Sequence, residues 1–204
     1  ILLFLDIHHF SQPRKWICRR WELAGGGIFT EENGTYFAKT VGNYNITMQS
    51  TGGISHVIPI QVTHGEMASL EIIASDAFVT ADDIVWLNTT RIDVMGNRLS
   101  VVIPQENWTV SDGMITAGQP AEWHAQRRGS KTLTASYAGM QNSVVVQVSE
   151  GAITDLVLVI DSVDSTSSLQ EITADDEITV KVKAMDADGN RWTENVAWTI
   201  EHIQ

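Results

Sequence analysis

Apolar and polar residues alternate along several short stretches of the chain. The alternation is clearest in ITVKVKAM at 178–185, and SVVVQV at 143–148 follows it more loosely. A period of two places successive side chains on opposite faces of a β-strand, so both stretches are predicted to be half-buried strands. Gly, Asn and Asp interrupt the pattern at short intervals, and no stretch keeps a 3.6-residue period over a dozen residues. The pattern predicts an all-β protein.

The sequence also repeats itself. TADD at 80–83 recurs at 173–176, and DVMGNR at 93–98 recurs as DADGNR at 186–191, both at an offset of 93 residues. Internal periodicity of this kind indicates successive copies of one structural unit. Several short strands in a unit of this length are typical of a β-sandwich.

A further copy lies upstream. Trp21 matches Trp108, and Gly42 matches Gly129, both at an offset of 87 residues. The matches predict three successive domains. Residues 1–65 would be a partial repeat without its first strands, residues 66–150 a complete repeat, and residues 151–204 a partial repeat without its last strands. We therefore expect the chain to be a segment of a longer protein.

Short motifs in the complete copy resemble a known family. They are DVMGN at 93–97, GMITA at 113–117, GSKTLTA at 129–135 and a Val-rich strand ending at Gly151. This order is similar to that of the bacterial immunoglobulin-like (Big) repeats of invasin- and intimin-type surface proteins, and of related archaeal surface proteins. The resemblance implies tandem immunoglobulin-like β-sandwich domains that serve as extracellular stalks or adhesin modules. It also implies that the Asp-x-x-Gly-Asn motif is a turn between two strands.

Composition excludes several classes of protein. A formal net charge of −12 argues against nucleic-acid binding, which needs clustered Lys and Arg. Cys18 is the single cysteine, so no disulfide can form within the chain, and no apolar run approaches the roughly 20 residues of a membrane span. The sequence contains no Gly-rich phosphate loop, HExxH, nucleophile elbow or CxxC. We therefore expect no enzyme activity and no cofactor, with calcium as the one alternative.

The DADGNR stretch has two interpretations. It resembles the start of a calcium loop, but the twelfth position from Asp186 is Ala197, where an EF-hand needs a bidentate Glu. The neighbouring copy also replaces Asp188 with Met95, which cannot bind calcium. Gly189 in a tight turn, with Asp and Asn bonding to nearby backbone, explains both copies, and we favour the turn. In the first copy, DIHHF at 6–10, the glycine is replaced by His, which we interpret as a divergent loop.

Calcium could bind at the domain junctions instead. Two aspartate pairs follow the first strand of successive copies, and two more aspartates lie in the Ser/Asp/Thr-rich stretch at 161–170. Clustered carboxylates at the end of a sandwich can hold calcium between domains, although exposed carboxylates more often only solvate a surface. The candidate ligands are Asp82, Asp83, Asp161, Asp164, Asp175 and Asp176.

The seven tryptophans divide into two groups. Trp21, Trp108 and Trp198 occupy matching positions, which predicts packing in the cores. Trp123 aligns with Tyr36, again a repeated core or edge position. Trp86 and Trp192 have no counterpart in the other copies, so shared packing does not explain them, and we regard them as candidate binding residues for a glycan or a partner protein. Trp16 is unmatched as well.

Four Asn-x-Thr sequences are candidate N-glycosylation sites of an exported protein. The acceptor residues are Asn33, Asn45, Asn88 and Asn107. The stretch at 13–20 is unusually basic, and we leave open whether it binds an anionic polymer or is a diverged end.

These observations favour a non-catalytic, extracellular stalk or adhesin segment whose main partners are the neighbouring repeats of its own chain. One alternative is a carbohydrate- or protein-binding module that uses the unmatched tryptophans. Another is a set of accessory domains of a secreted hydrolase.

Overall fold

The computed structural model describes residues 18–23, 26–30, 35–50, 52–161, 163–165 and 171–201. These residues form β-strands and one short 3-10 turn at Gln105–Asn107, and they contain no α-helix. The described part of the chain therefore holds no helix long and apolar enough to cross a membrane. The all-β prediction is confirmed. The chain divides into two compact units, Ile1–Ser69 with Arg91–Leu99, and Leu70–Thr90 with Ser100–Gln204.

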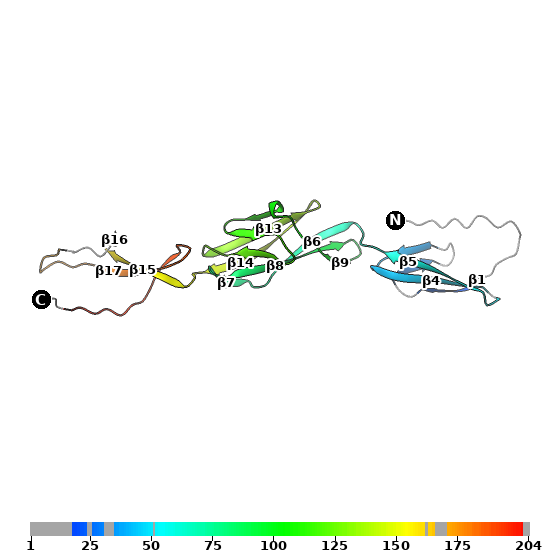
Figure 1. The fold of residues 1–204 in the computed structure, drawn as a ribbon, viewed down its shortest axis with the longest axis horizontal. Helices are drawn as coiled ribbons and strands as arrows, with labels where there is room; N and C mark the ends of the chain where they lie inside the picture. The colour runs from blue at the N-terminus through cyan, green and yellow to red at the C-terminus, as the bar shows by residue number, and fades with distance from the viewer. Residues whose placement is uncertain are drawn as a thin grey trace. The chain divides into compact units, whose positions relative to one another are not determined.

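The first unit contains an antiparallel three-stranded sheet in the order β1-β4-β5, blue to cyan in Figure 1. Its strands are β1 Cys18–Leu23, β4 Gly42–Ser50 and β5 Ser55–Val62. A separate antiparallel pair is formed by β2 Gly27–Thr30 and β3 Thr35–Ala38. Ile46 in β4 pairs opposite Ile58 in β5 and is buried.

A second sheet has the order β11-β12-β8-β6, and β9 also pairs with β8. Its strands are β6 Met67–Ala74, β8 Ile84–Asp93, β9 Arg98–Ser100, β11 Met114–Thr116 and β12 Ala121–His124. Strand β8 alternates from Ile84 to Thr89: Val85, Leu87 and Thr89 are buried and the residues between them are exposed. This sheet therefore buries one face and presents the other to solvent.

A third sheet has the order β10-β13-β14-β7 and buries alternate residues in the same way. Its strands are β7 Phe78–Thr80, β10 Trp108–Val110, β13 Gly129–Tyr137 and β14 Met140–Ser149. The predicted strand at 143–148 lies within β14. Trp108 is buried, as the repeat predicted, and Trp123 is fully buried.

The β13–β14 hairpin has the register of the β4–β5 hairpin. Gly129 pairs opposite Val148, as Gly42 pairs opposite Val62. The aligned glycines of the sequence repeat therefore begin equivalent strands in the structure.

The last sheet has the order β16-β15-β17-β18. Its strands are β15 Ile153–Ile160, β16 Val163–Ser165, β17 Val180–Asp186 and β18 Arg191–Thr193. The stretch predicted at 178–185 corresponds to β17. The core position predicted for Trp198 is wrong, because this side chain is 56% exposed. Trp108 is held in β10 by pairing with β13, whereas residues 194–201 pair with no strand in the described part of the chain.

Candidate functional site: two Asp-Asn turns that bind an earlier segment

The two Asp-x-x-Gly-Asn motifs form the same tight turn. In the first, between β8 and β9, the Gly96 N–H donates to the Asp93 carbonyl oxygen at 2.9 Å, and the Asp93 N–H donates to the Asn97 carbonyl oxygen at 3.0 Å. In the second, the corresponding bonds of Gly189 and Asp186 are both 3.2 Å long. Gly96 has φ +84° and Gly189 has φ +80°, a conformation that glycine adopts without a steric penalty. The interpretation of both stretches as turns is confirmed.

The carboxylate of Asp93 is buried and accepts hydrogen bonds from four nitrogen donors. Oδ1 accepts from the backbone N–H groups of Met95 and Asn97, both at 2.9 Å. Oδ2 accepts from Asn97 Nδ2 at 2.9 Å and from the Gly65 N–H at 3.0 Å. One carboxylate thus fixes its own turn and also binds a backbone group 28 residues earlier.

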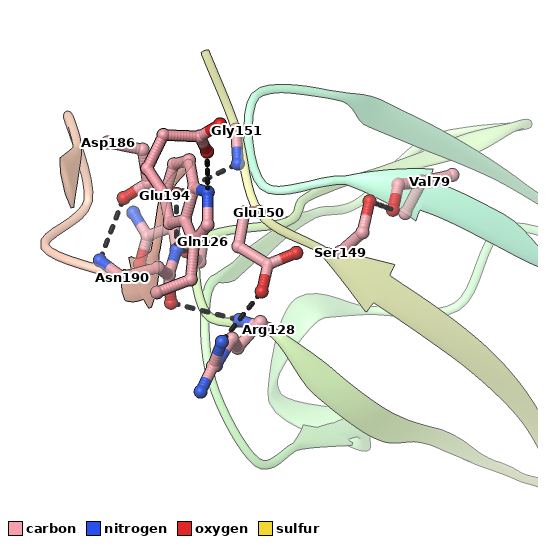
Figure 2. Close-up of polar contacts among 10 residues, drawn as sticks. Val79, Gln126, Arg128, Ser149, Glu150, Gly151, Asp186, Asn190 and Glu194 are labelled. Atoms are coloured by element: carbon pink, nitrogen blue, oxygen red, sulfur yellow. Dashed lines mark hydrogen bonds and ion pairs between the residues drawn. The ribbon is translucent and has the colours of Figure 1, made fainter. Parts of the chain in front are cut away.

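Asp186 repeats this arrangement. Its Oδ1 accepts from the N–H groups of Asp188 at 3.1 Å and Asn190 at 2.8 Å. Its Oδ2 accepts from Asn190 Nδ2 at 2.7 Å and from the Gly151 N–H at 2.9 Å, the contact drawn in Figure 2. Gly65 and Gly151 are matching residues of the sequence repeat, so the two carboxylates bind equivalent positions.

The asparagine of each turn binds a second backbone segment through both ends of its amide. Asn97 Nδ2 donates to the Lys39 carbonyl at 2.7 Å, and its Oδ1 accepts from the Val41 N–H at 3.0 Å. The bound segment immediately precedes β4. Because both partners are backbone groups, this contact does not depend on the side chains of the segment.

Asn190 binds the segment before β13 in the same way. Its Nδ2 donates to the Gln126 carbonyl at 2.8 Å, and its Oδ1 accepts from the Arg128 N–H at 3.0 Å (Figure 2). We call each set of contacts a junction clasp. The first clasp comprises Asp93, Asn97, Gly65, Lys39 and Val41, and the second comprises Asp186, Asn190, Gly151, Gln126 and Arg128.

Both aspartates of the clasps are ionised at neutral pH. Burial alone would raise the pKa of Asp93, but the hydrogen bonds from Gly65, from the side chain and backbone of Asn97, and from Met95 lower it to about 2. Burial likewise opposes ionisation of Asp186, and bonds from Gly151, Asn190 and Asp188 lower its pKa. The bonds to these carboxylates are therefore charge-assisted, the stronger class of hydrogen bond.

The second clasp has two additional contacts. Asp82 Oδ2 accepts from the Ala152 N–H at 2.6 Å. The Arg128 guanidinium forms an ion pair of 2.6 Å with Glu150, which Figure 2 shows. The pKa of Glu150 is lowered by its own backbone N–H and by Arg128. At the first clasp, Val41 and His64 occupy the matching positions and cannot form that ion pair. The segment at Gly65 has other contacts instead: Arg91 Nη2 donates to the Gly65 carbonyl at 3.2 Å, and the Val94 N–H donates to the Glu66 carbonyl at 3.0 Å.

The aspartates proposed as calcium ligands have separate backbone and hydroxyl partners. Asp83 accepts from the N–H and hydroxyl of Thr80, and Asp176 accepts from those of Thr173. Asp161 accepts from the Thr179 N–H at 3.0 Å. Asp175 is exposed, and the side chain of Asp164 lies outside the described residues.

The second clasp has a high local density of negative charge. The pKa of Asp188 is raised by burial and by the charges of Asp186, Asp82 and Asp112. Even so, no group of three or more His, Cys, Asp or Glu side chains that could hold a metal occurs within the described residues. Junctional calcium binding stays a prediction.

The two candidate tryptophans differ in their surroundings. Trp86 lies in β8 and is 42% exposed. Trp192 in β18 is half-buried, and its Nε1 donates to Glu194 Oε2 at 2.9 Å. Trp86 is therefore the more accessible of the two, and ligand binding by either stays a prediction.

The other candidate positions are only partly described. The acceptor residues Asn45, Asn88 and Asn107 are exposed. Asn33, Trp16, the stretch at 6–10 and the side chains of the basic stretch at 13–20 lie outside the described residues.

No protein-family model matches the chain, and no curated protein matches it. The chain is similar to a structure of surface layer protein SbsC, domains 1–6, with 17% identity and a TM-score of 0.32 over 86% of the chain and 24% of that structure. For domains 4–9 of the same protein the identity is 20% and the TM-score 0.31, over 78% of the chain and 26% of the structure. The chain spans about a quarter of the length of these structures.

Proposed function

We propose that this chain is a non-catalytic spacer segment of an extracellular cell-surface protein. In this proposal it consists of tandem immunoglobulin-like β-sandwiches, with the complete one at residues 66–150. The observation that carries the proposal is the recurrence of the junction clasp, with the same donor and acceptor atoms, at two matching positions. A contact that recurs with the repeat serves the connection between repeats.

The position of each clasp supports this role. Gly65 and Gly151 lie at the predicted boundaries between repeats, and each is bound by an aspartate of the repeat that follows. The asparagine of the same turn binds the backbone of the repeat that precedes. The turn thus holds the linker and the earlier repeat together, which is what a stiff junction requires.

The strength of the contacts also fits a spacer. A hydrogen bond to a charged group contributes about 1.5–3 kcal/mol, and leaving a buried carboxylate without its partners costs more. Bending that separates Asp93 from Gly65, or Asp186 from Gly151, breaks such a bond. The junctions would therefore resist bending and keep a distal element at a set distance from the cell surface.

Spin-label distances across the second clasp test the proposal. With the native Cys18 replaced by Ser, labels at the exposed positions Thr132→Cys in β13 and Lys181→Cys in β17 report on the angle between two predicted repeats. We expect a narrow distance distribution that broadens in Asn190→Ala. The control Asn45→Ala changes an exposed asparagine outside the clasps and should leave the distribution unchanged. A broad distribution in the unaltered clasp would contradict the spacer role.

A further inference from the structure

The solvent face of the second sheet carries exposed apolar side chains. Trp86 in β8 is 42% exposed, and Ile84, Ile73 and Met114 on the same sheet are also exposed. Ile84 pairs opposite His124, which in turn pairs opposite Met114, so the two apolar residues lie in one row across the sheet. Exposed apolar side chains that lie next to one another favour contact with another molecule or group, because the contact removes apolar surface from water.

An N-glycosylation acceptor lies on this same face. Along β8, Ile84, Trp86 and Asn88 are exposed, while Val85, Leu87 and Thr89 are buried. The period of two therefore places Asn88 on the side of Trp86, and residues two apart on one face are roughly 7 Å from each other. Asn88-Thr89-Thr90 matches the Asn-x-Thr acceptor pattern.

We propose that Asn88 is N-glycosylated and that the first sugar of the glycan packs on the indole of Trp86. This inference rests on the extracellular location proposed above. The sugar donor is a lipid-pyrophosphate-linked oligosaccharide. The Asn88 amide nitrogen forms a bond to C1 of the first sugar and loses a proton, while the bond from C1 to the pyrophosphate oxygen breaks. The lipid pyrophosphate leaves with that electron pair, and nothing is oxidised or reduced.

The physical reason for the pairing is burial of apolar surface. One face of a pyranose ring presents C–H groups, and the indole presents a large flat apolar surface beside the acceptor. Contact between them removes apolar area of Trp86 from water, which is favourable. The glycan thereby covers part of a face that the fold leaves exposed.

The other described acceptors lack this arrangement. The residue two positions before Asn45 is Asn43, and the residue two positions before Asn107 is Gln105. Neither is aromatic. Asn45 is therefore a matched control, because it is exposed within a strand but has no aromatic residue two positions before it.

The test is a thermodynamic cycle on the full chain secreted from eukaryotic cells that perform N-glycosylation. Peptide mass spectrometry gives the occupancy of each acceptor. Thr90→Ala abolishes the Asn88 acceptor, and Thr47→Ala abolishes the Asn45 acceptor. Each change is made with Trp86, with Trp86→Ala and with Trp86→Phe, and the Tm is measured for every protein with its glycans and after their enzymatic removal.

We expect Asn88 to be occupied and its glycan to raise the Tm by about 2–4 °C, a shift typical of one modest interaction in a chain of this size. Trp86→Ala should abolish that increment, and Trp86→Phe should retain most of it. The effect of the Asn45 glycan should not depend on residue 86. An unmodified Asn88, or an increment that is equal with and without the indole, would overturn the inference. The spin-label experiment uses unglycosylated protein, so the spacer proposal stands or falls separately.

Discussion

Removing one amide from the second clasp should reduce the protection of two backbone N–H groups that are distant in sequence, those of Arg128 and Gly151. Asn190→Ala deletes the acceptor of the Arg128 N–H and one of the donors to Asp186 Oδ2. The Gly151 N–H keeps its acceptor, but the carboxylate that holds it becomes less constrained. We therefore expect the protection of Arg128 against hydrogen exchange to be lost and that of Gly151 to fall.

The size of the effect follows from the bonds that are lost. The substitution removes one charge-assisted bond, worth about 1.5–3 kcal/mol, and two neutral bonds of about 1 kcal/mol each. Residues 126 and 128 are exposed, so water replaces part of the neutral bonds. A net loss of about 2–4 kcal/mol remains. Since every 1.4 kcal/mol is a factor of ten, clasp opening should become at least about thirtyfold more frequent.

The assay is amide hydrogen exchange followed by NMR, with the first clasp as an internal control. Asn190→Ala should leave the exchange rates of Val41 and Gly65 unchanged, because these N–H groups are bound by Asn97 and Asp93. Asn97→Ala should give the opposite pattern. If Arg128 and Gly151 exchange at the same rates in Asn190→Ala as in the unaltered chain, the clasp does not hold the junction.

Three further predictions concern packing and ionisation. A Cβ at residue 151 would lie 2.6 Å from Asp82 Oδ2, whereas one at residue 65 would lie 3.6 Å from Asp93 Oδ2. Gly151→Ala should therefore lower the Tm by several degrees and Gly65→Ala by little, and equal shifts would contradict the prediction. The pKa of Asp93 is about 2 in the folded protein and 3.8 in its unperturbed state, so its contribution to stability is complete above about pH 4 and is lost as the pH falls to about 2. An NMR titration midpoint near 4 for this carboxyl would refute the lowered pKa. Trp108→Ala should reduce the free energy of unfolding by about 3–5 kcal/mol in denaturant titrations, as other large core truncations do, and a change near zero would remove Trp108 from the core.

The strands and turns could be predicted from the sequence because their signals are local. A period of two marks β17 and β14, and Gly with Asp and Asn marks the turns. Trp198 shows where that reasoning fails. Its residue type matches Trp108, but burial depends on a strand such as β13 lying beside it, and a matching residue does not supply that strand.

The clasps themselves could not be predicted. Asn97 and Asn190 bind the backbone carbonyls of Lys39 and Gln126. Every residue has a backbone carbonyl, so the sequence at these two positions does not indicate the contact. Asp82 illustrates the same point, since its charge suggests a calcium ligand, whereas its Oδ2 accepts a hydrogen bond from the Ala152 N–H. The one available signal was their order along the chain, since each Asp-x-x-Gly-Asn motif follows a matching glycine, Gly65 by 28 residues and Gly151 by 35.

The most direct test is whether the segments on either side of the second clasp align as one body in solution. Residual dipolar couplings of residues 129–148 and 153–160 can be fitted to alignment tensors in the unaltered chain and in Asn190→Ala. We predict one shared tensor for the unaltered chain and separate tensors for Asn190→Ala. Separate tensors in the unaltered chain, with both clasps intact, would contradict a spacer whose junctions are stiffened by these turns.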